Sequence, residues 1–173
     1  DEDCVKMQGL SLKNCGVKIV DNVKKKVIYT DFGELLFTHF GVSGPVILSA
    51  SAHMRDMAAG RYTLILDLKP ALNCDQLDKR LQRDLEKNNN KNFANSLSEL
   101  LPQKMIDVMV TRSGIPGETK CNSVTREQRK KLLDVLKEFS VEISGFRSIN
   151  EAVITCGGVS VKEINPKTME SKL

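Results

Sequence analysis

The chain has 173 residues, with 26 lysines and arginines against 22 aspartates and glutamates, so its formal net charge is +4. Hydrophobic residues make up 40% and charged residues 28% of the chain, which excludes a collagen-like, low-complexity or wholly disordered protein. The length fits one medium domain or two small ones. It is too short for a dinucleotide-binding domain together with a separate substrate domain.

Charge, apolar runs and cysteines narrow the class of protein further. Residues 71–138 hold thirteen basic and ten acidic side chains in mixed order, which indicates solvated helix faces. This mixed charge makes a nucleic-acid partner unlikely. The absence of Trp, which would stack on bases, points the same way. The apolar stretch 44–59 is interrupted by charges and is shorter than the roughly 20 residues of a membrane span. The cysteines are odd in number and lack a CxxC pair, so we expect reduced thiols, no metal site and a cytoplasmic location.

The first third of the chain is β-like with one helix. Residues 5–12 alternate, and two β-branched runs at 17–20 and 27–30 flank a polar tip, which predicts a hairpin. Lys24–Lys26 at that tip are read as a solvated turn, with a phosphate contact as the alternative. A helix is expected from about Pro45 to Ala58, ended by Gly60, followed by a strand over residues 61–68.

From residue 72 to residue 139 the period becomes helical. Leu77, Leu81 and Leu85 recur at four-residue spacing, and Thr125 with Gln128 forms a capping box before a further helix. Strand-like residues return at 141–143, 152–155 and 159–164. The pattern predicts an α+β fold, in which a discontinuous β-barrel-like subdomain (residues 1–69 and 139–173) is interrupted by an all-helical subdomain (residues 70–138).

Two segments could carry chemistry. The first places Thr38, His39, Gly41, Ser43, Gly44 and Pro45 between a strand and a helix; glycine allows close approach of a flat ligand, while a plain capped turn is the alternative. The second is Thr155–Val159 with its Gly157–Gly158 pair, which fits a β-bulge or a ligand contact. Cys156 has no assignable base, and His53 is read as a helix-surface histidine, so catalytic residues stay unassigned.

The two segments, with their flanks, resemble a known family. GELLFTHFGVSGPVIL (Gly33–Leu48) and AVITCGGVSVKEINPKTMESKL (Ala152–Leu173) are similar to signature stretches of the HI0933-like family, also called BaiN-like or YhiN-like NAD(P)/FAD-dependent oxidoreductases. The chain resembles the insert domain of that family without its FAD-binding Rossmann domain. In the family this insert is a β-barrel-like subdomain interrupted by a helical subdomain.

The resemblance implies roles for specific residues. Thr38, His39, Gly41, Ser43, Gly44 and Pro45 match the family's THFGxSGP stretch, and Thr155, Gly157, Gly158 and Val159 match its TxGGV stretch. Both are expected to face the flavin and substrate cleft in the parent protein. The stretch Glu163–Ser171 is expected to guide the chain back into the FAD domain.

Three functions follow as hypotheses. The first is the substrate-side or lid domain of an FAD-dependent, NAD(P)H-using oxidoreductase of unknown small-molecule substrate, with the parent's own FAD domain as partner. If this hypothesis holds, the 173-residue chain without its FAD domain is expected to bind no cofactor and to be inactive. The second is a nucleic-acid- or protein-binding barrel module, and the third is a structural insert whose helices make a dimer contact.

Overall fold

The computed structural model describes residues 2–153 and 158–173. Its centre is an antiparallel five-stranded sheet in the order β3-β2-β1-β4-β5, curled into a half-barrel. The strands are β1 (Ser11–Asp21), β2 (Lys26–Thr38), β3 (Gly41–Ser43), β4 (Tyr62–Asp67) and β5 (Phe139–Ile143). A short helix α1 (Glu2–Lys6) precedes the sheet, and α2 (Pro45–Ser51) packs on β2. The expected α+β class with barrel-like character is confirmed.

Alternation along the strands determines which face is buried. In β1, Cys15, Val17 and Ile19 are buried, while Lys18 between them is exposed. In β4, Tyr62, Leu64 and Leu66 are buried in the same way. The β1–β2 ladder shifts register between Leu12 and Cys15 and again between Ile19 and Val20. Such bulges bend a strand and increase its twist, which curls the sheet.

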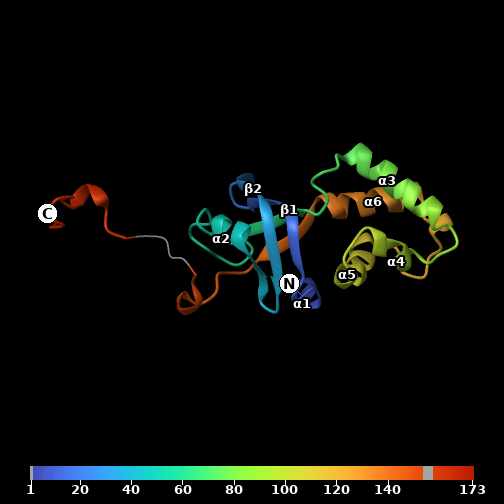
Figure 1. Cartoon of the computed structure of the whole chain (residues 1–173), viewed down its shortest axis with the longest axis horizontal. Helices are drawn as coiled ribbons and strands as arrows, with labels where there is room; N and C mark the ends of the chain where they lie inside the picture. Colours follow the sequence, from blue (N-terminus) through green and yellow to red (C-terminus); the bar gives the residue numbers. More distant parts are fainter. Residues whose placement is uncertain (1, 154–157) are drawn as a thin grey trace.

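Four helices follow β4 in the chain and precede β5: α3 (Cys74–Lys87), α4 (Phe93–Ser96), α5 (Gln103–Ser113) and α6 (Arg126–Lys137). Figure 1 shows them together at one end of the sheet. Leu77, Leu81 and Leu85 are the buried residues of α3, as their spacing predicts. The Thr125–Gln128 capping box at the start of α6 is confirmed. Three further turns, η1 (Leu97–Glu99), η2 (Cys121–Ser123) and η3 (Ile149–Glu151), are 3₁₀ helices.

Two cationic side chains fix these helices to the sheet. Lys137 of α6 donates from Nζ to Asp67 Oδ2 at 2.5 Å and to the carbonyl oxygen of Leu72 at 2.9 Å. Arg112 of α5 donates from Nε to Asp3 Oδ2 at 2.6 Å and from Nη1 to the carbonyl oxygen of Ser140 at 2.5 Å. Charge-assisted hydrogen bonds are the strong class, so both contacts oppose separation of helices and sheet.

Several sequence predictions for single elements are wrong. Residues 5–12 were expected to form a strand, but Glu2–Lys6 is helical and the strand begins only at Ser11. The helix α2 ends at Ser51 instead of Ala58, because the chain turns there and buries Met54 in the core. Residues 159–164 contain the 3₁₀ turn η4 (Val161–Glu163) and no strand, since this segment has no sheet edge to pair with.

The C-terminal segment stands apart from the sheet. Figure 1 shows residues 158–173 away from the other elements. Its hydrogen bonds are internal, for example from the backbone N–H of Asn165 to the carbonyl oxygen of Glu170. Ala152 and Val153 are in no strand, and the rest of the strand expected at 152–155 falls outside the described residues. The assignment of 139–173 to the barrel subdomain stays a prediction.

Asp21 links folding to pH at the end of β1. Its buried carboxylate accepts hydrogen bonds from the backbone N–H groups of Lys24 and Val23, each at 3.0 Å, and Arg61 lies 3.6 Å away. These contacts, with the Lys24 N–H first, lower the pKa of Asp21 below its ordinary value. A lowered folded-state pKa adds stability above the unfolded pKa, and this stability is lost as the pH falls through the folded value.

We therefore expect an acid-dependent loss of stability at this site. The free energy of unfolding of the wild type, measured in urea, is expected to fall from about pH 5 downward. The Asp21→Asn variant is expected to be less stable than the wild type at about pH 7, and its free energy of unfolding is expected to change less with pH over this range. Asp75→Asn, at an exposed aspartate in the first turn of α3, is the matched control. Parallel pH profiles for wild type and Asp21→Asn would contradict the assignment.

Candidate functional site

The first candidate segment folds as a tight turn. β2 ends at Thr38 and β3 begins at Gly41, and these two residues pair across the turn. His39 and Phe40 form its exposed tip. Gly41 has a φ of +138°, and no atom lies within 4 Å of the position that a Cβ would occupy. The backbone at Gly41 is therefore open to close approach by another molecule.

The second glycine of this segment serves packing. Gly44 caps the start of α2 with a φ of +106°. A Cβ there would lie 2.8 Å from the carbonyl oxygen of Glu34 and 3.2 Å from Leu35 Cα, so Gly44 lets the helix start lie directly on β2. Ser43 ends β3 without capping α2, and Pro45 occupies the first helical turn, as its fixed φ favours.

An aromatic and cationic group surrounds the tip of the turn. The His39 ring meets the Phe40 ring edge-on, with centroids 5.0 Å apart. The guanidinium of Arg147, from the segment after β5, lies 4.7 Å from the Phe40 ring centroid. Glu151 holds that guanidinium through two oxygens at 2.8–3.0 Å. The fold thus brings a residue more than a hundred positions away onto the first candidate segment.

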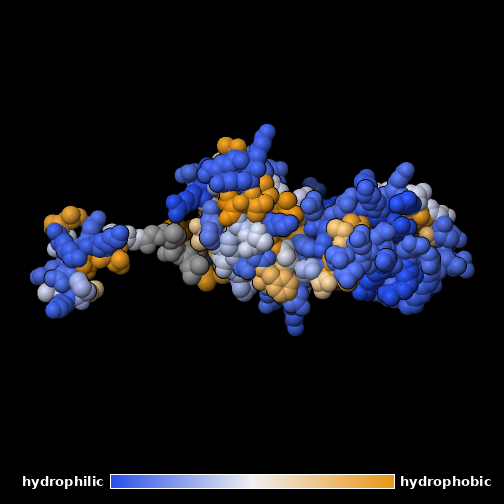
Figure 2. Space-filling model, turned by 90° about the horizontal axis from the view of Figure 1, so that it is seen from above, coloured by the Kyte–Doolittle hydropathy of each residue, from blue (hydrophilic) through white to orange (hydrophobic). Residues whose placement is uncertain are grey.

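Phe40 itself is 43% exposed, and its neighbour in this group is a cation. Figure 2 shows hydrophobic side chains gathered over the central part of the molecule, whereas the helical end is mostly hydrophilic. An exposed aromatic ring beside a guanidinium offers a flat face to another molecule. Sequence reasoning missed Phe40 and Arg147. Phe40 stood inside the quoted stretch, but nothing in the sequence indicates that Arg147 would reach it.

Thr38 adds an unsatisfied polar atom to the same place. Its Oγ1 is buried and has no hydrogen-bond partner within the part of the chain that the structure describes. A buried hydroxyl without a partner costs about 1–3 kcal/mol. Because this oxygen is buried, the described structure does not present it to another molecule.

The second candidate segment cannot be joined to the first. Thr155 and Gly157 lie outside the described residues, as does Cys156. Gly158 has a φ of +140° with nothing within 4 Å of an added Cβ, and Val159 is 71% exposed. Both belong to the C-terminal segment that Figure 1 places apart from β2. Their expected place at the same cleft stays a prediction.

A polar cluster on β2 also escaped the sequence analysis. The Tyr29 hydroxyl donates to Asp31 Oδ2 at 2.5 Å, and the Tyr29 ring stacks on His53 with centroids 4.7 Å apart. The bond from Tyr29, followed by that from the Phe32 N–H, lowers the pKa of Asp31. Burial is the main cause that raises the pKa of Tyr29. The i,i+2 spacing on a strand could have shown that Tyr29 and Asp31 share a face.

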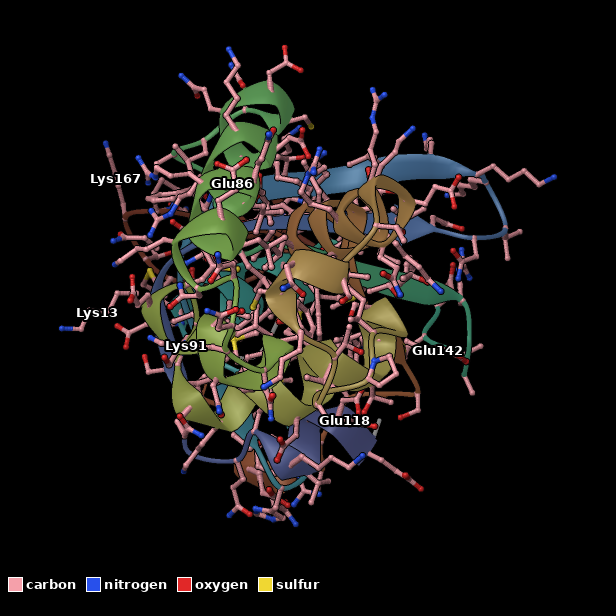
Figure 3. The ribbon with its side chains drawn as sticks, turned by 90° about the vertical axis from the view of Figure 1, so that its right-hand side faces the viewer. Lys13, Glu86, Lys91, Glu118, Glu142 and Lys167 are labelled. Carbon is pink, nitrogen blue, oxygen red and sulfur yellow. The ribbon has the colours of Figure 1, made fainter. Side chains whose placement is uncertain are left out.

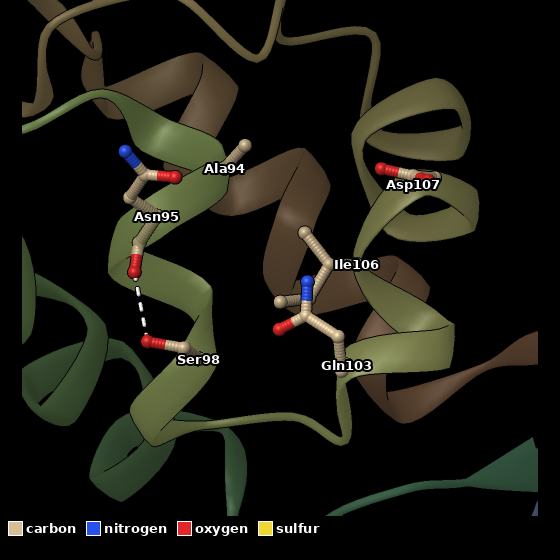
Figure 4. A pocket seen from close by; sticks show the side chains of 6 residues that line it. All are labelled: Ala94, Asn95, Ser98, Gln103, Ile106 and Asp107. Atoms are coloured by element: carbon tan, nitrogen blue, oxygen red, sulfur yellow. Dashed lines mark hydrogen bonds between the residues drawn. The ribbon is translucent and has the colours of Figure 1, made fainter.

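A shallow hollow on the helices lacks the groups for catalysis. It lies between α4 and α5, has a volume of about 290 Å³, and is lined by Ala94, Asn95, Ser98, Gln103, Ile106 and Asp107. Figure 4 shows the Ser98 hydroxyl donating to the carbonyl oxygen of Asn95 and Asp107 standing across the hollow. One carboxylate with amides around it offers polar contacts and no acid–base pair.

Thiols and metal ligands give no alternative centre. Burial raises the pKa of the Cys15 thiol to about 12, and its Sγ donates to the carbonyl oxygen of Asp67; a thiol is a nucleophile only as the thiolate. Among residues 2–153 and 158–173, no group of three His, Cys, Asp or Glu side chains could hold a metal ion. Over the same residues, no helix has the length and apolar character needed to cross a bilayer.

One family model matches most of the chain, and curated proteins are similar to it. Residues 1–154 match the family model described as "HI0933-like protein barrel and H2TH domain". The chain is 29% identical over 140 residues to the ribosomal RNA dihydrouridine synthase of Haemophilus influenzae, covering 81% of this chain and 33% of that protein. It is 28% identical over 138 residues to the Escherichia coli protein of the same name, covering 80% and 32%.

A third relative carries a different name. The 3-dehydro-bile acid delta(4,6)-reductase of Clostridium scindens is 24% identical over 157 residues, covering 90% of this chain and 38% of that protein. The chain therefore spans about a third of the length of the curated relatives that it matches.

Proposed function

The chain belongs to the HI0933-like family, and from that premise we propose that it is the substrate-side domain of a flavin-dependent reductase. The parent protein would use NAD(P)H to reduce a carbon–carbon double bond conjugated to a carbonyl group. The favoured substrate is a uridine within RNA. The cytoplasmic location expected from the sequence is part of this proposal.

The observation that carries the proposal is the chemistry shared by the relatives' names. Dihydrouridine is uridine in which the C5=C6 bond, conjugated to the C4 carbonyl, has gained two hydrogens. A delta(4,6)-reductase acting on a 3-dehydro (3-oxo) compound also adds hydrogen to an alkene conjugated to a ketone. In the proposed reaction a hydride and a proton add across the double bond, and NAD(P)H, the source of the hydride, is oxidised to NAD(P)⁺. The substrates differ greatly in size, whereas the reacting unit is the same.

The residues of this chain fit one wall of a flavin site and cannot form the whole site. The sheet is antiparallel and the sequence has no GxGxxG turn, which a Rossmann phosphate site needs. The open backbone at Gly41 would allow a flat ring system to approach closely. FAD, when bound, would carry the hydride from the nicotinamide to the substrate.

The aromatic and cationic group beside this wall suits the substrate. Phe40 and the Arg147 guanidinium offer flat faces on which a base that has left its stack can pack. An enzyme that modifies a base inside structured RNA must take the base out of the stack. Two of the three relatives described above are named for RNA, so RNA is preferred to a sterol. This differs from our expectation from the sequence, in which the mixed charge of the helices made a nucleic-acid partner unlikely.

The proposal is tested with the intact protein that carries this chain. The purified protein is incubated with NADPH or NADH and an unmodified ribosomal RNA transcript, and the nucleosides are analysed by mass spectrometry. We expect a uridine that has gained two hydrogens. Phe40→Ala is expected to lower kcat/KM by roughly tenfold or more, because positioning is lost. Val27→Ala, at an exposed apolar residue of β2 outside the turn, is the control.

Two results would contradict the proposal. RNA that stays unmodified while a 3-oxo sterol with a conjugated double bond is reduced would replace RNA by a sterol as the substrate. A protein that oxidises no nicotinamide with either substrate would remove the reductase function altogether.

A further inference from the structure

We propose that the outer end of the helices is an RNA-backbone contact surface, separate from the β2–β3 turn; this rests on the RNA substrate proposed above. We call this surface the helical tip. It consists of the connection between α3 and α4 (residues 88–92), the later part of the connection between α5 and α6 (residues 117–125), and Arg126, the first residue of α6.

Backbone hydrogen bonds join the two connections of the helical tip. The N–H of Cys121 donates to the carbonyl oxygen of Lys91 at 3.1 Å, and that of Asn122 donates to Asn89 at 3.1 Å. The N–H of Phe93 donates to Thr119 at 2.8 Å. Asn92 and Lys120 also form an isolated antiparallel bridge. The side chains of the helical tip are therefore presented by an ordered backbone, which lowers the entropy cost of binding.

The charge of the helical tip favours an anion. It holds three cations, Lys91, Lys120 and Arg126, against one carboxylate, Glu118. Figure 3 looks onto this end of the molecule and shows Lys91 and Glu118 well separated on it. Two cations of the neighbouring helices are neutralised within the chain: Lys87 pairs with Glu99 at 2.9 Å, and Arg129 pairs with Asp78 at 2.8 Å.

The three cations are available to an external ligand. Lys91 and Arg126 are exposed, and neither makes an ion pair among residues 2–153 and 158–173. Each is close enough to a carboxylate to contribute to a lowered pKa, Lys91 to that of Glu99 and Arg126 to that of Asp78. Lys120 Nζ donates to the carbonyl oxygen of Asn90 at 3.2 Å and to Asn92 Oδ1 at 2.9 Å. An ammonium group has three donors, so one hydrogen of Lys120 remains, on a side chain already held in place.

The uncharged residues point to the RNA backbone. Asn89, Asn90, Asn122 and Ser123 are exposed around the cations. Lysine, arginine, asparagine and serine are the side chains that contact phosphates and sugars in nucleic-acid complexes. Aromatic groups that would stack bases are absent from residues 88–92 and 117–126. The expected contact is thus one that positions the RNA and does not read its sequence.

The place of the helical tip suggests what it contributes. In Figure 1 it lies at the far end of the helices, away from the β2–β3 turn. A small substrate at the turn would not reach it, whereas a folded RNA would. The helical tip would therefore favour a uridine in a large RNA over the free nucleoside.

The test compares two charge reversals of equal size in this 173-residue chain. Lys91→Glu with Arg126→Glu changes the helical tip, and Lys13→Glu with Lys18→Glu changes exposed residues of β1. Lys120 is left alone because its side chain holds the connection at Asn90. Binding of a fluorescein-labelled RNA hairpin is measured by anisotropy between about 50 and 200 mM salt. Thermal unfolding checks that both variants are folded.

We expect the helical-tip variant to bind roughly tenfold more weakly at the lowest salt, with a shallower salt dependence, and the β1 variant to change less than about twofold. In the intact protein, the helical-tip variant is expected to raise KM for the transcript and leave kcat unchanged. Equal losses in both variants, or no RNA binding by the wild type at about 50 mM salt, would overturn the inference. Uridine reduction by a helical-tip variant with unchanged KM would overturn this inference alone and leave the proposed function intact.

Discussion

Replacing Gly44 by alanine is expected to destabilise the protein by roughly 2–4 kcal/mol and to lower Tm by about 10 °C. Gly44 has φ +106° and ψ +167°, a region that is essentially restricted to glycine. In addition, the new Cβ would lie 2.8 Å from the carbonyl oxygen of Glu34 and 3.3 Å from the N–H nitrogen of Leu36. Both neighbours are backbone of a central strand, so neither can move without disturbing the β1–β2 ladder.

Gly41→Ala is the matched control for this prediction. Gly41 also has a positive φ, +138°, but an added Cβ would meet no atom within 4 Å. It is expected to cost about 1–2 kcal/mol from conformation alone. Equilibrium urea unfolding of both variants separates the cost of the positive φ, which both share, from the cost of the steric clash, which only Gly44→Ala has. Equal losses would show that the contact with Glu34 does not matter.

Replacing Lys137 by methionine is expected to cost about 2 kcal/mol and to loosen the helices from the sheet. Its ammonium is the shared donor for Asp67, Leu72 and Lys69, the last at 3.3 Å from Nζ to the carbonyl oxygen. Removing it leaves the Asp67 carboxylate, whose side chain is 24% exposed, without its cation. Because methionine keeps most of the length and apolar volume of lysine, the change reports chiefly on the charge and its hydrogen bonds.

Lys130→Met tests whether the loss of stability comes from the contacts of Lys137 and not from replacing any lysine of α6. Lys130 is exposed on the same helix, and its replacement is expected to change stability by less than about 0.5 kcal/mol. Hydrogen exchange should show faster opening at the junction of α6 and β4 in the Lys137 variant only. Unchanged exchange there would mean that the helices are held by their apolar contacts alone.

Local signals predicted much of the fold correctly. The leucine spacing of α3, the Thr125–Gln128 capping box and the hairpin around the Lys24–Lys26 tip are determined by neighbours within a few residues. The same kind of signal failed at residues 5–12. The chain there begins with a helical turn that buries Cys4 and Met7 against the body of the protein, and an alternating pattern in so short a segment does not separate the two structures.

The candidate site was predictable only in part, because its contacts are non-local. The turn from Thr38 to Gly41 follows from its glycine and its place after a strand. The approach of Arg147 to Phe40 depends on the path of the segment after β5, which no short-range pattern predicts. The expected strand at residues 159–164 failed for the same reason, since a β-like run forms a strand only when an edge is available.

The visible absorption spectrum of the intact protein tests the central claim most directly. It is recorded on the purified protein before and after NADH or NADPH is added, without oxygen. We expect a flavin spectrum that bleaches with the nicotinamide and returns when unmodified ribosomal RNA is supplied as acceptor. A protein that is colourless as purified, and gains no flavin spectrum when FAD is added, would contradict the proposal that this chain forms one wall of a flavin site.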